Sequence, residues 1–253
     1  MSEVLKAVAG RYELPLAFAA VGLLMWVCHA AAGRLAGGRV HGSAVAIVAA
    51  LVLAGVAGWT TGGSEGLADV AGLSGLAVLG GAALRDLAIV ATAFGVDAGE
   101  LRKAGLAGAV ALAVGLVVPF VVGAGVAWSF GYRDPADMTT LGAGTATYIV
   151  GPVTGEALGA SDEVITLSFA AGLVKSILTM VVTPWVAPSI GLDNPRSAVV
   201  FGGLIGTTSG VAGGLAATDE ALVPYGAMTA TFYTGLGCLV GPSVMFWAVS
   251  AVT

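Results

Sequence analysis

The most constraining feature of the chain is a long apolar stretch, residues 141–241, that glycine and threonine repeatedly interrupt. It contains LGAGTATYIVGPVTGEALGAS near its start and FGGLIGTTSGVAGGLAATDE further on. A lipid-facing anchor would consist of Leu, Ile and Val without such breaks. Non-helical backbone inside a bilayer is tolerated only where it is buried in protein or lines a cavity, and many carriers build their sites from broken helices. The pattern therefore predicts a transporter rather than an anchor.

The composition excludes several classes of protein. The 253 residues are 57% hydrophobic and 10% charged, whereas soluble domains are about 25% charged. A net charge of -5 without a basic run argues against nucleic acid as a partner. Cys28 and Cys238 lie in apolar segments and form neither a disulfide framework nor a metal motif. We therefore expect a lipid bilayer as the environment, and no cofactor apart from a coupling ion.

The hydropathy pattern predicts an all-α polytopic membrane protein. A span of about 20 apolar residues crosses the hydrocarbon core, and we expect one transporter domain over residues 1–253, with residues 1–13 as an interfacial lead-in. Two of its segments, 139–160 and 198–217, are discontinuous and either cross or re-enter. The eight expected segments are residues 14–32, 42–59, 70–94, 104–130, 139–160, 164–186, 198–217 and 224–252.

The two interrupted segments end in matching sequences, LGASDEVI at 158–165 and LAATDEAL at 215–222. Both segments also carry glycines at every fourth position, a spacing that lets membrane helices approach closely. These features indicate an internal repeat, and coincidence in a chain with 40 glycines is the alternative. The glycines given this structural role are Gly151, Gly155, Gly206 and Gly210.

Arg85 and Asp86 are the sharpest candidates for a binding site, because both lie at the centre of an apolar segment. Ionised groups at that depth face a bundle interior or a water-filled cavity and are functional candidates by default. The planar fork of Arg85 suits a carboxylate, and Asp86 suits a coupling cation or a proton. The alternative is a structural pair satisfied by neighbouring helices.

Two further charges lie in apolar segments. Glu156, with the hydroxyl of Thr154, offers oxygen ligands for a cation such as Na+, and an interfacial position is the alternative for Glu156. Lys175 is expected to complement Glu156 or Asp86 in a structural role, and contact with the substrate is the alternative.

Hydroxyl groups cluster at the interruptions, where they can cap free N–H groups of broken helices, and helix N-termini favour anions. A small anion held by backbone N–H groups, hydroxyls and one arginine fits this inventory. The candidate substrate ligands beside Arg85 are Thr145, Thr147, Thr207, Thr208 and Ser209.

An enzyme is not expected. GLSG at 72–75 resembles the short motif of rhomboid proteases, but that chemistry needs a histidine from a later helix. His29 and His41 both precede the serine.

Four blocks of the sequence together resemble the MadM subunit of the two-component malonate carrier. They are GRVHGSAVAIVAALVLAG (38–55), GGAALRDLAIVATAF (80–94), GAGTATYIVGPVTGEALGAS (142–161) and a long block from NPRSAVVFGG to CLVGPS (194–243). The resemblance implies secondary uptake of malonate coupled to Na+ or H+, a smaller membrane partner, MadL, and the inner membrane of a bacterial cell. It implies no list of binding positions, so the site residues above depend on the physical argument.

The predicted function is therefore import of a small dicarboxylate by a membrane subunit that works with a MadL-like partner. The sequence does not decide between a single complex of the two subunits and a higher oligomer. The alternatives are a scaffolding subunit and a cation-translocating subunit tied to a decarboxylase.

Overall fold

The computed structural model describes residues 12–35, 40–79 and 98–253, and every regular element in these ranges is helical. Five described helices are long and apolar enough to cross a membrane: Glu13–Arg34, Gly42–Thr61, Gly105–Ser129, Asp162–Ile190 and Glu220–Ser250. The expectation of an all-α membrane protein is confirmed, and that of eight spanning segments is not. Most of the third expected segment, residues 70–94, lies outside the described residues. Two others are pairs of short helices.

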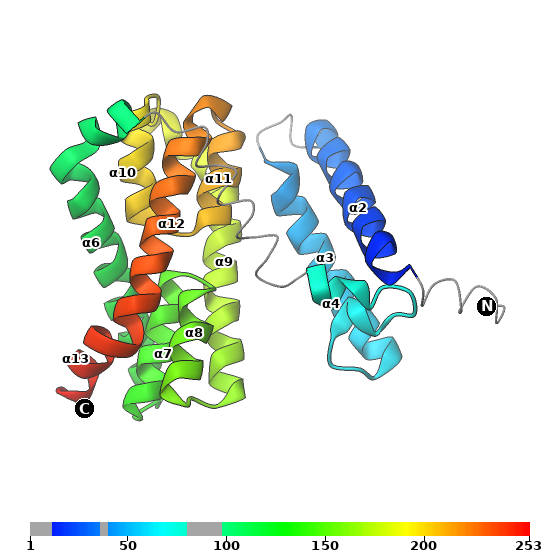
Figure 1. The fold of residues 1–253 in the computed structure, drawn as a ribbon, viewed down its shortest axis with the longest axis horizontal. Coiled ribbons are helices and arrows are strands. Elements are labelled where there is room, and N and C mark those ends of the chain that lie inside the picture. The colour runs from blue at the N-terminus through cyan, green and yellow to red at the C-terminus, as the bar shows by residue number, and fades with distance from the viewer. Residues whose placement is uncertain (1–11, 36–39, 80–97) are drawn as a thin grey trace. The chain divides into compact units, whose positions relative to one another are not determined.

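The chain divides into two compact units, residues 1–91 and 92–253. In the first unit, α2 (Glu13–Leu35) packs against α3 (Gly42–Thr61), followed by a 3-10 turn (Gly66–Asp69) and α4 (Gly75–Leu79) (Figure 1). The helices meet closely where Gly42 faces His29, because a Cβ on Gly42 would strike the imidazole. The indole of Trp59, near the end of α3, is exposed, as amphipathic aromatic rings are at membrane interfaces.

The second unit contains three long helices and two helical hairpins. The long helices are α6 (Ala98–Ser129), α9 (Asp162–Val186) and α12 (Val223–Val240), and α12 continues through a π-helical turn (Gly241–Met245) into α13 (Phe246–Ser250). We name α7 (Pro135–Ala146) with α8 (Val150–Leu158) the first hairpin, and α10 (Pro195–Ile205) with α11 (Thr208–Ala216) the second hairpin. The tip of a hairpin is the turn between its two helices.

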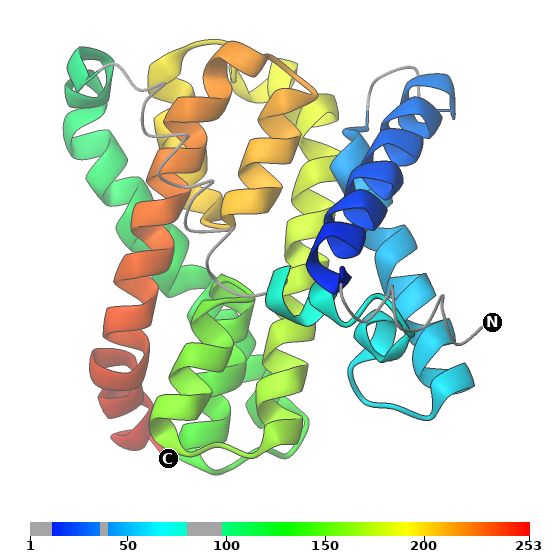
Figure 2. The same ribbon diagram turned by 45° about the vertical axis from the view of Figure 1, so that its right-hand side comes forward.

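The two hairpins enter the second unit from opposite ends. In both views α7 and α8 occupy the half that contains the C-terminus, α10 and α11 occupy the other half, and the tips meet near the middle (Figures 1 and 2). A nine-residue helix such as α8 is about 14 Å long, roughly half of the hydrocarbon thickness. Each interrupted segment therefore turns back as part of a hairpin and does not run through the unit as one helix.

Both hairpins begin with the same local chemistry. Asp134 caps α7 by accepting from the N–H groups of Ala136 and Asp137, and Pro135 occupies the first turn. Asn194 forms a capping box with Ser197 at the start of α10, and Pro195 follows it. These are the residue types that favour helix starts. The matching sequences 158–165 and 215–222 connect α8 to α9 and α11 to α12, respectively.

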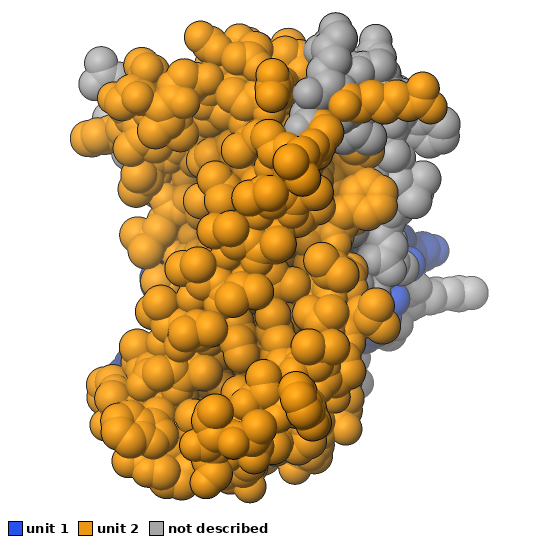
Figure 3. All heavy atoms as spheres, turned by 90° about the vertical axis from the view of Figure 1, so that its left-hand side faces the viewer, with its two compact units in different colours: residues 1–91 blue, residues 92–253 orange. Residues whose placement is uncertain are grey.

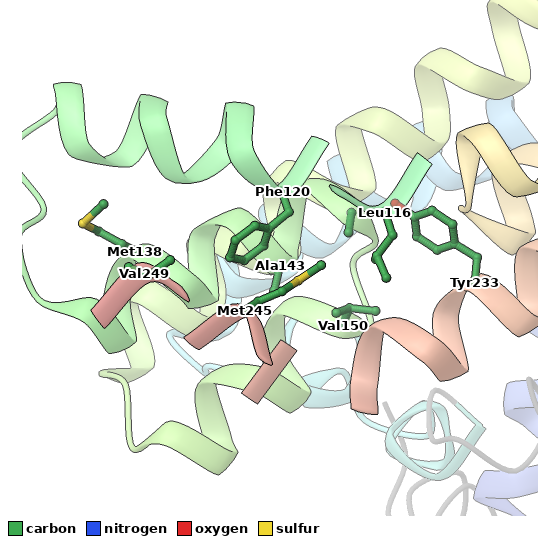
Figure 4. Close-up of a cluster of buried hydrophobic side chains, with 9 residues drawn as sticks. Leu116, Phe120, Met138, Ala143, Val150, Tyr233, Met245 and Val249 are labelled. Atoms are coloured by element: carbon green, nitrogen blue, oxygen red, sulfur yellow. The ribbon is translucent and has the colours of Figure 1, made fainter. Parts of the chain in front are cut away.

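A proline inside α6, Pro119, leads to a hydrogen bond between α6 and α12. Because proline has no N–H group, the carbonyl of Gly115 one turn earlier lacks its helical donor. The hydroxyl of Tyr233 on α12 donates to that oxygen at 2.6 Å, and Tyr233 is fully buried. Figure 4 shows Tyr233 near Leu116 of α6 at one end of the buried cluster, and Met138 and Val249 at the other.

Glycine brings the helices of the second unit into backbone contact. A Cβ on Gly172 of α9 would strike the backbone of Tyr148 at the first tip, and one on Gly202 of α10 would strike the carbonyl of Gly226 on α12. On the outer face of α6, which faces the viewer in Figure 3, apolar side chains such as Val117 and Val121 are exposed. Glycine therefore lies at the closest helix contacts, as is common in membrane bundles.

Gly172→Ala should destabilise the second unit, because the added methyl group meets backbone that cannot move aside cheaply. Overpacking of this kind costs about 1–3 kcal/mol, measurable as a lower melting temperature of the protein in detergent. Gly125→Ala on α6 is the control, since a Cβ there meets open space. Equal melting temperatures for the two variants would contradict the close approach.

Candidate functional site

The two hairpin tips are joined to each other and to the middle of α9 by side-chain hydroxyls. Tyr148 at the first tip and Ser209 in the first turn of α11 have their oxygens 3.2 Å apart. Ser176 on α9 lies 2.8 Å from the same Ser209 oxygen. We name this region, residues 146–150 and 205–209 with residues 175–176 and 233–234, the tip junction.

The N-terminus of α8 is closed by its own threonine. The Thr147 hydroxyl accepts from the N–H groups of Ile149 and Val150, both at 3.1 Å, and Thr147 is buried. The first turn of a helix has N–H groups without intrahelical partners, and a side-chain oxygen in this position satisfies them. The positive end of α8 is therefore already occupied by a protein group.

The N-terminus of α11 differs, because no side chain caps it. Thr207 occupies the cap position, is 0% exposed, and its hydroxyl oxygen has no hydrogen-bond partner. The neighbouring Thr208 hydroxyl oxygen is also buried without a partner. Unpaired polar groups in an apolar interior cost free energy, so such groups commonly indicate a missing ligand or water. The α11 N-terminus thus offers hydrogen-bond donors at the positive end of a helix dipole.

The first helices of the hairpins end at carbonyl groups that side chains of the long helices approach. Lys175 of α9 donates from Nζ to the Ala146 carbonyl at 2.8 Å. The Thr234 hydroxyl of α12 donates to the Ala230 carbonyl of its own helix at 3.0 Å, and its oxygen lies 3.5 Å from the Gly206 carbonyl oxygen. Gly206 has a positive φ of 80°, and any side chain there would strike the ring of Tyr233. The end of α10 therefore requires glycine.

The structure brings part of the predicted substrate site together. Thr147, Thr207, Thr208 and Ser209 all lie at the tip junction. Thr145 is the penultimate residue of α7, next to the tip junction, and its hydroxyl contacts the Pro119 and Gly142 carbonyls, each at 2.7 Å. Arg85 and Asp86 lie outside the described residues.

The predicted cation ligands on α8 lie away from the tips. Glu156 is exposed near the end of α8, at the outer end of the hairpin. Thr154 is fully buried, its hydroxyl has no partner, and it lies against Gly241 in the π-helical turn. In the part of the chain that the structure describes, no group of three His, Cys, Asp or Glu side chains is placed to hold a metal ion.

The glycines with an expected structural role all lie at close contacts. A Cβ on Gly151 or Gly155 of α8 would meet side chains of α9, Ser168 and Ile165, respectively. A Cβ on Gly210 of α11 would meet the Ser176 carbonyl at 2.9 Å.

Sequence reasoning missed Tyr148 and Ser176 and favoured a structural role for Lys175 over contact with the substrate. Tyr148 is the only residue with a polar side chain between Thr147 and Thr154, and Ser176 adjoins the intramembrane lysine. Both polar positions could have been noticed in the sequence. Only the packing of α9 against both hairpins brings Tyr148 and Ser176 to the same place. A groove of about 480 Å³ along α9 is lined by Thr145, Lys175 and Ile205 among others, and so runs beside the ends of α7 and α10.

Removal of the hydroxyl from each of the two tip threonines should have different effects on the stability of the protein. Thr147→Val removes the cap of α8 and should lower the free energy of unfolding by about 1 kcal/mol. Thr207→Val removes an unpartnered buried hydroxyl and should leave stability unchanged or raise it. Melting temperatures of both variants, without substrate, check this; a loss at Thr207 equal to that at Thr147 would show that Thr207 has a structural partner.

The chain was also compared with known proteins. No significant match is found among curated proteins or among solved structures. The family model for the malonate/sodium symporter MadM subunit matches residues 5–253. This match covers nearly the whole chain and agrees with the multi-pass helical architecture, so the chain belongs to the MadM family of malonate/sodium symporter subunits.

Proposed function

We propose that the chain imports malonate across the inner membrane of a bacterial cell, coupled to Na+ or H+, together with a small MadL-like membrane subunit. The observation that carries this proposal is the meeting of two re-entrant hairpin tips, from opposite ends of the second unit, in a symporter-family chain. Broken helices that meet near the bilayer midplane are how many secondary transporters form substrate and ion sites.

We further propose that α7–α9 and α10–α12 are two copies of one repeat in opposite orientations. The N-cap and proline pairs at the hairpin starts support this, as do the matching sequences that end each hairpin. The tip contacts support it as well, since Lys175 and Ala146 are 29 residues apart while Thr234 and Gly206 are 28 apart. Inverted repeats allow a central site to open alternately to the two sides of the membrane.

In this proposal the dicarboxylate is held at the tip junction. Arg85 binds one carboxylate in a two-point contact. The second carboxylate is bound by the broken helices, with Thr145, Thr147, Thr207, Thr208 and Ser209 as the hydroxyl-bearing residues around it. A cation bound nearby offsets the cost of bringing a dianion into a region of low dielectric, which is the physical reason for coupling.

Arg85→Gln tests the substrate proposal in proteoliposomes that contain the chain and its candidate partner subunit. Uptake of labelled malonate should be concentrative under an imposed Na+ or proton gradient. The variant should lose affinity by about tenfold or more, because a charged hydrogen bond contributes about 1.5–3 kcal/mol. Arg196→Gln, an exposed arginine at the start of α10, is the control.

Absence of concentrative uptake under either gradient would contradict the proposed function. Uptake that needs no gradient would indicate a passive channel. Normal uptake by Arg85→Gln would instead favour a scaffolding role for this chain.

For the coupling cation we propose Asp86, and the alternative is the set of oxygen ligands on α8, Glu156 and Thr154. Asp86→Asn should abolish the dependence of uptake on the cation gradient, because the neutral amide no longer compensates the cation's charge. Glu156→Gln distinguishes between the two sets of ligands. Because Glu156 is exposed, we expect this variant to change the uptake rate by less than about twofold. Initial rates at varied Na+ concentration and pH measure both; gradient dependence that survives in Asp86→Asn would rule out Asp86.

A further inference from the structure

Lys175 is a charged side chain in the middle of a membrane-spanning helix without an anionic partner among the residues that the structure describes. Its described hydrogen bond goes to the neutral Ala146 carbonyl, and its ammonium lies 5.6 Å from the centroid of the Tyr233 ring. An ammonium has three N–H donors, so this carbonyl occupies only one of them. Charges at this depth are expensive and are usually paired with an opposite charge or placed on a substrate pathway.

The groups around Lys175 match an anion. The adjacent residue, Ser176, contacts Ser209 in the first turn of α11, and Ser209 also contacts Tyr148. That same turn is the uncapped helix N-terminus with the unpartnered hydroxyls of Thr207 and Thr208. The ammonium lies beside the Tyr233 ring, and Gly206, which directly precedes Thr207, lies against the same ring. An ammonium, a positive helix end and free hydroxyls are therefore grouped around Tyr233, and no described residue supplies a negative charge to this set.

The first tip does not provide a second position of this kind. Its helix N-terminus is closed by Thr147, and the end of α7 is closed by Lys175 itself. The corresponding contact at the second tip is made by the neutral Thr234. Positive charge and free donors are thus concentrated on one side of the tip junction, between Lys175 and α11.

We propose that Lys175 and the first turn of α11, Thr207–Ser209, form the subsite for one substrate carboxylate, and that Lys175 makes the site selective for a dianion. This proposal rests on the proposed function and narrows it, because it assigns the second carboxylate to one helix N-terminus and adds a lysine. The N+–H···O- contact is charge-assisted and is stronger than a hydrogen bond between neutral groups.

The test compares malonate with malonamate, in which one carboxylate is a neutral amide. The wild-type protein with its partner subunit should bind malonate more tightly than malonamate, measured by binding of labelled malonate in detergent and competition by each compound. Lys175→Gln should reduce that preference by about tenfold or more, since the second carboxylate no longer meets a charge. Lys175→Arg keeps the charge and should keep the preference within about threefold of the wild type.

Thr207→Val is a second test that does not depend on whether the lysine variants fold. It removes a hydroxyl that has no partner in the protein. It should weaken malonate binding by about threefold or more, the value of one hydrogen bond, and reduce the preference over malonamate. Thr139→Val is the matched control, a fully buried threonine whose hydroxyl bonds to Pro135 within α7. It should bind both compounds as the wild type does.

Three results would overturn the subsite. Lys175→Gln that loses affinity but keeps the wild-type preference would show a structural role only. An Asp86→Asn/Lys175→Gln double variant that regains wild-type affinity would identify Lys175 as the counter-ion of Asp86. If Lys175→Gln does not fold, unchanged binding by Thr207→Val decides against the proposal. Wild-type binding without concentrative uptake contradicts the proposed function alone, and absence of malonate binding contradicts both.

Discussion

Every polar backbone group at a helix break inside a membrane must find a partner within the protein, and the second unit is organised around this requirement. The breaks leave carbonyl groups at Ala146 and Gly206 and N–H groups at the starts of α8 and α11. Lys175 donates to the Ala146 carbonyl from the middle of α9, the Thr234 hydroxyl on α12 lies 3.5 Å from the Gly206 carbonyl, and Thr147 accepts from the first N–H groups of α8. The start of α11 is the exception, because no side chain caps it.

Close helix packing is a consequence of the same requirement. Mid-helix side chains reach the tips only if α9 and α12 approach the hairpins at backbone distance. Glycine provides that approach at Gly172 and Gly202, and the positive φ of Gly206 lets α10 end beneath Tyr233. Tyr233 in turn satisfies the carbonyl that Pro119 leaves free on α6. Breaks, glycines and polar mid-helix residues therefore form one interdependent system.

Much of this arrangement was predictable from local chemistry. Gly-Thr interruptions in apolar sequence predicted broken helices, and the structure contains breaks at both. The hydroxyls of Thr147, Thr207, Thr208 and Ser209 were predicted to lie at those breaks because capping is a local interaction. Eight spans were predicted because hydropathy measures length and apolarity but not direction, so a hairpin reads like a crossing helix. The separation of Glu156 from the tips has the same cause, since it follows from α8 turning back.

The sequence alone determined the environment, the helical class and the positions of the breaks, because burial in lipid, hydrogen-bond satisfaction and capping depend on composition and on nearby residues. Only the tertiary structure decided that the hairpins enter from opposite ends and that Tyr148, Lys175 and Ser209 share one junction. These contacts join segments that are far apart in the chain, as with Tyr148 and Ser209, which are 61 residues apart. No local pattern encodes which faces of the helices meet, because that choice depends on the packing of all the helices at once.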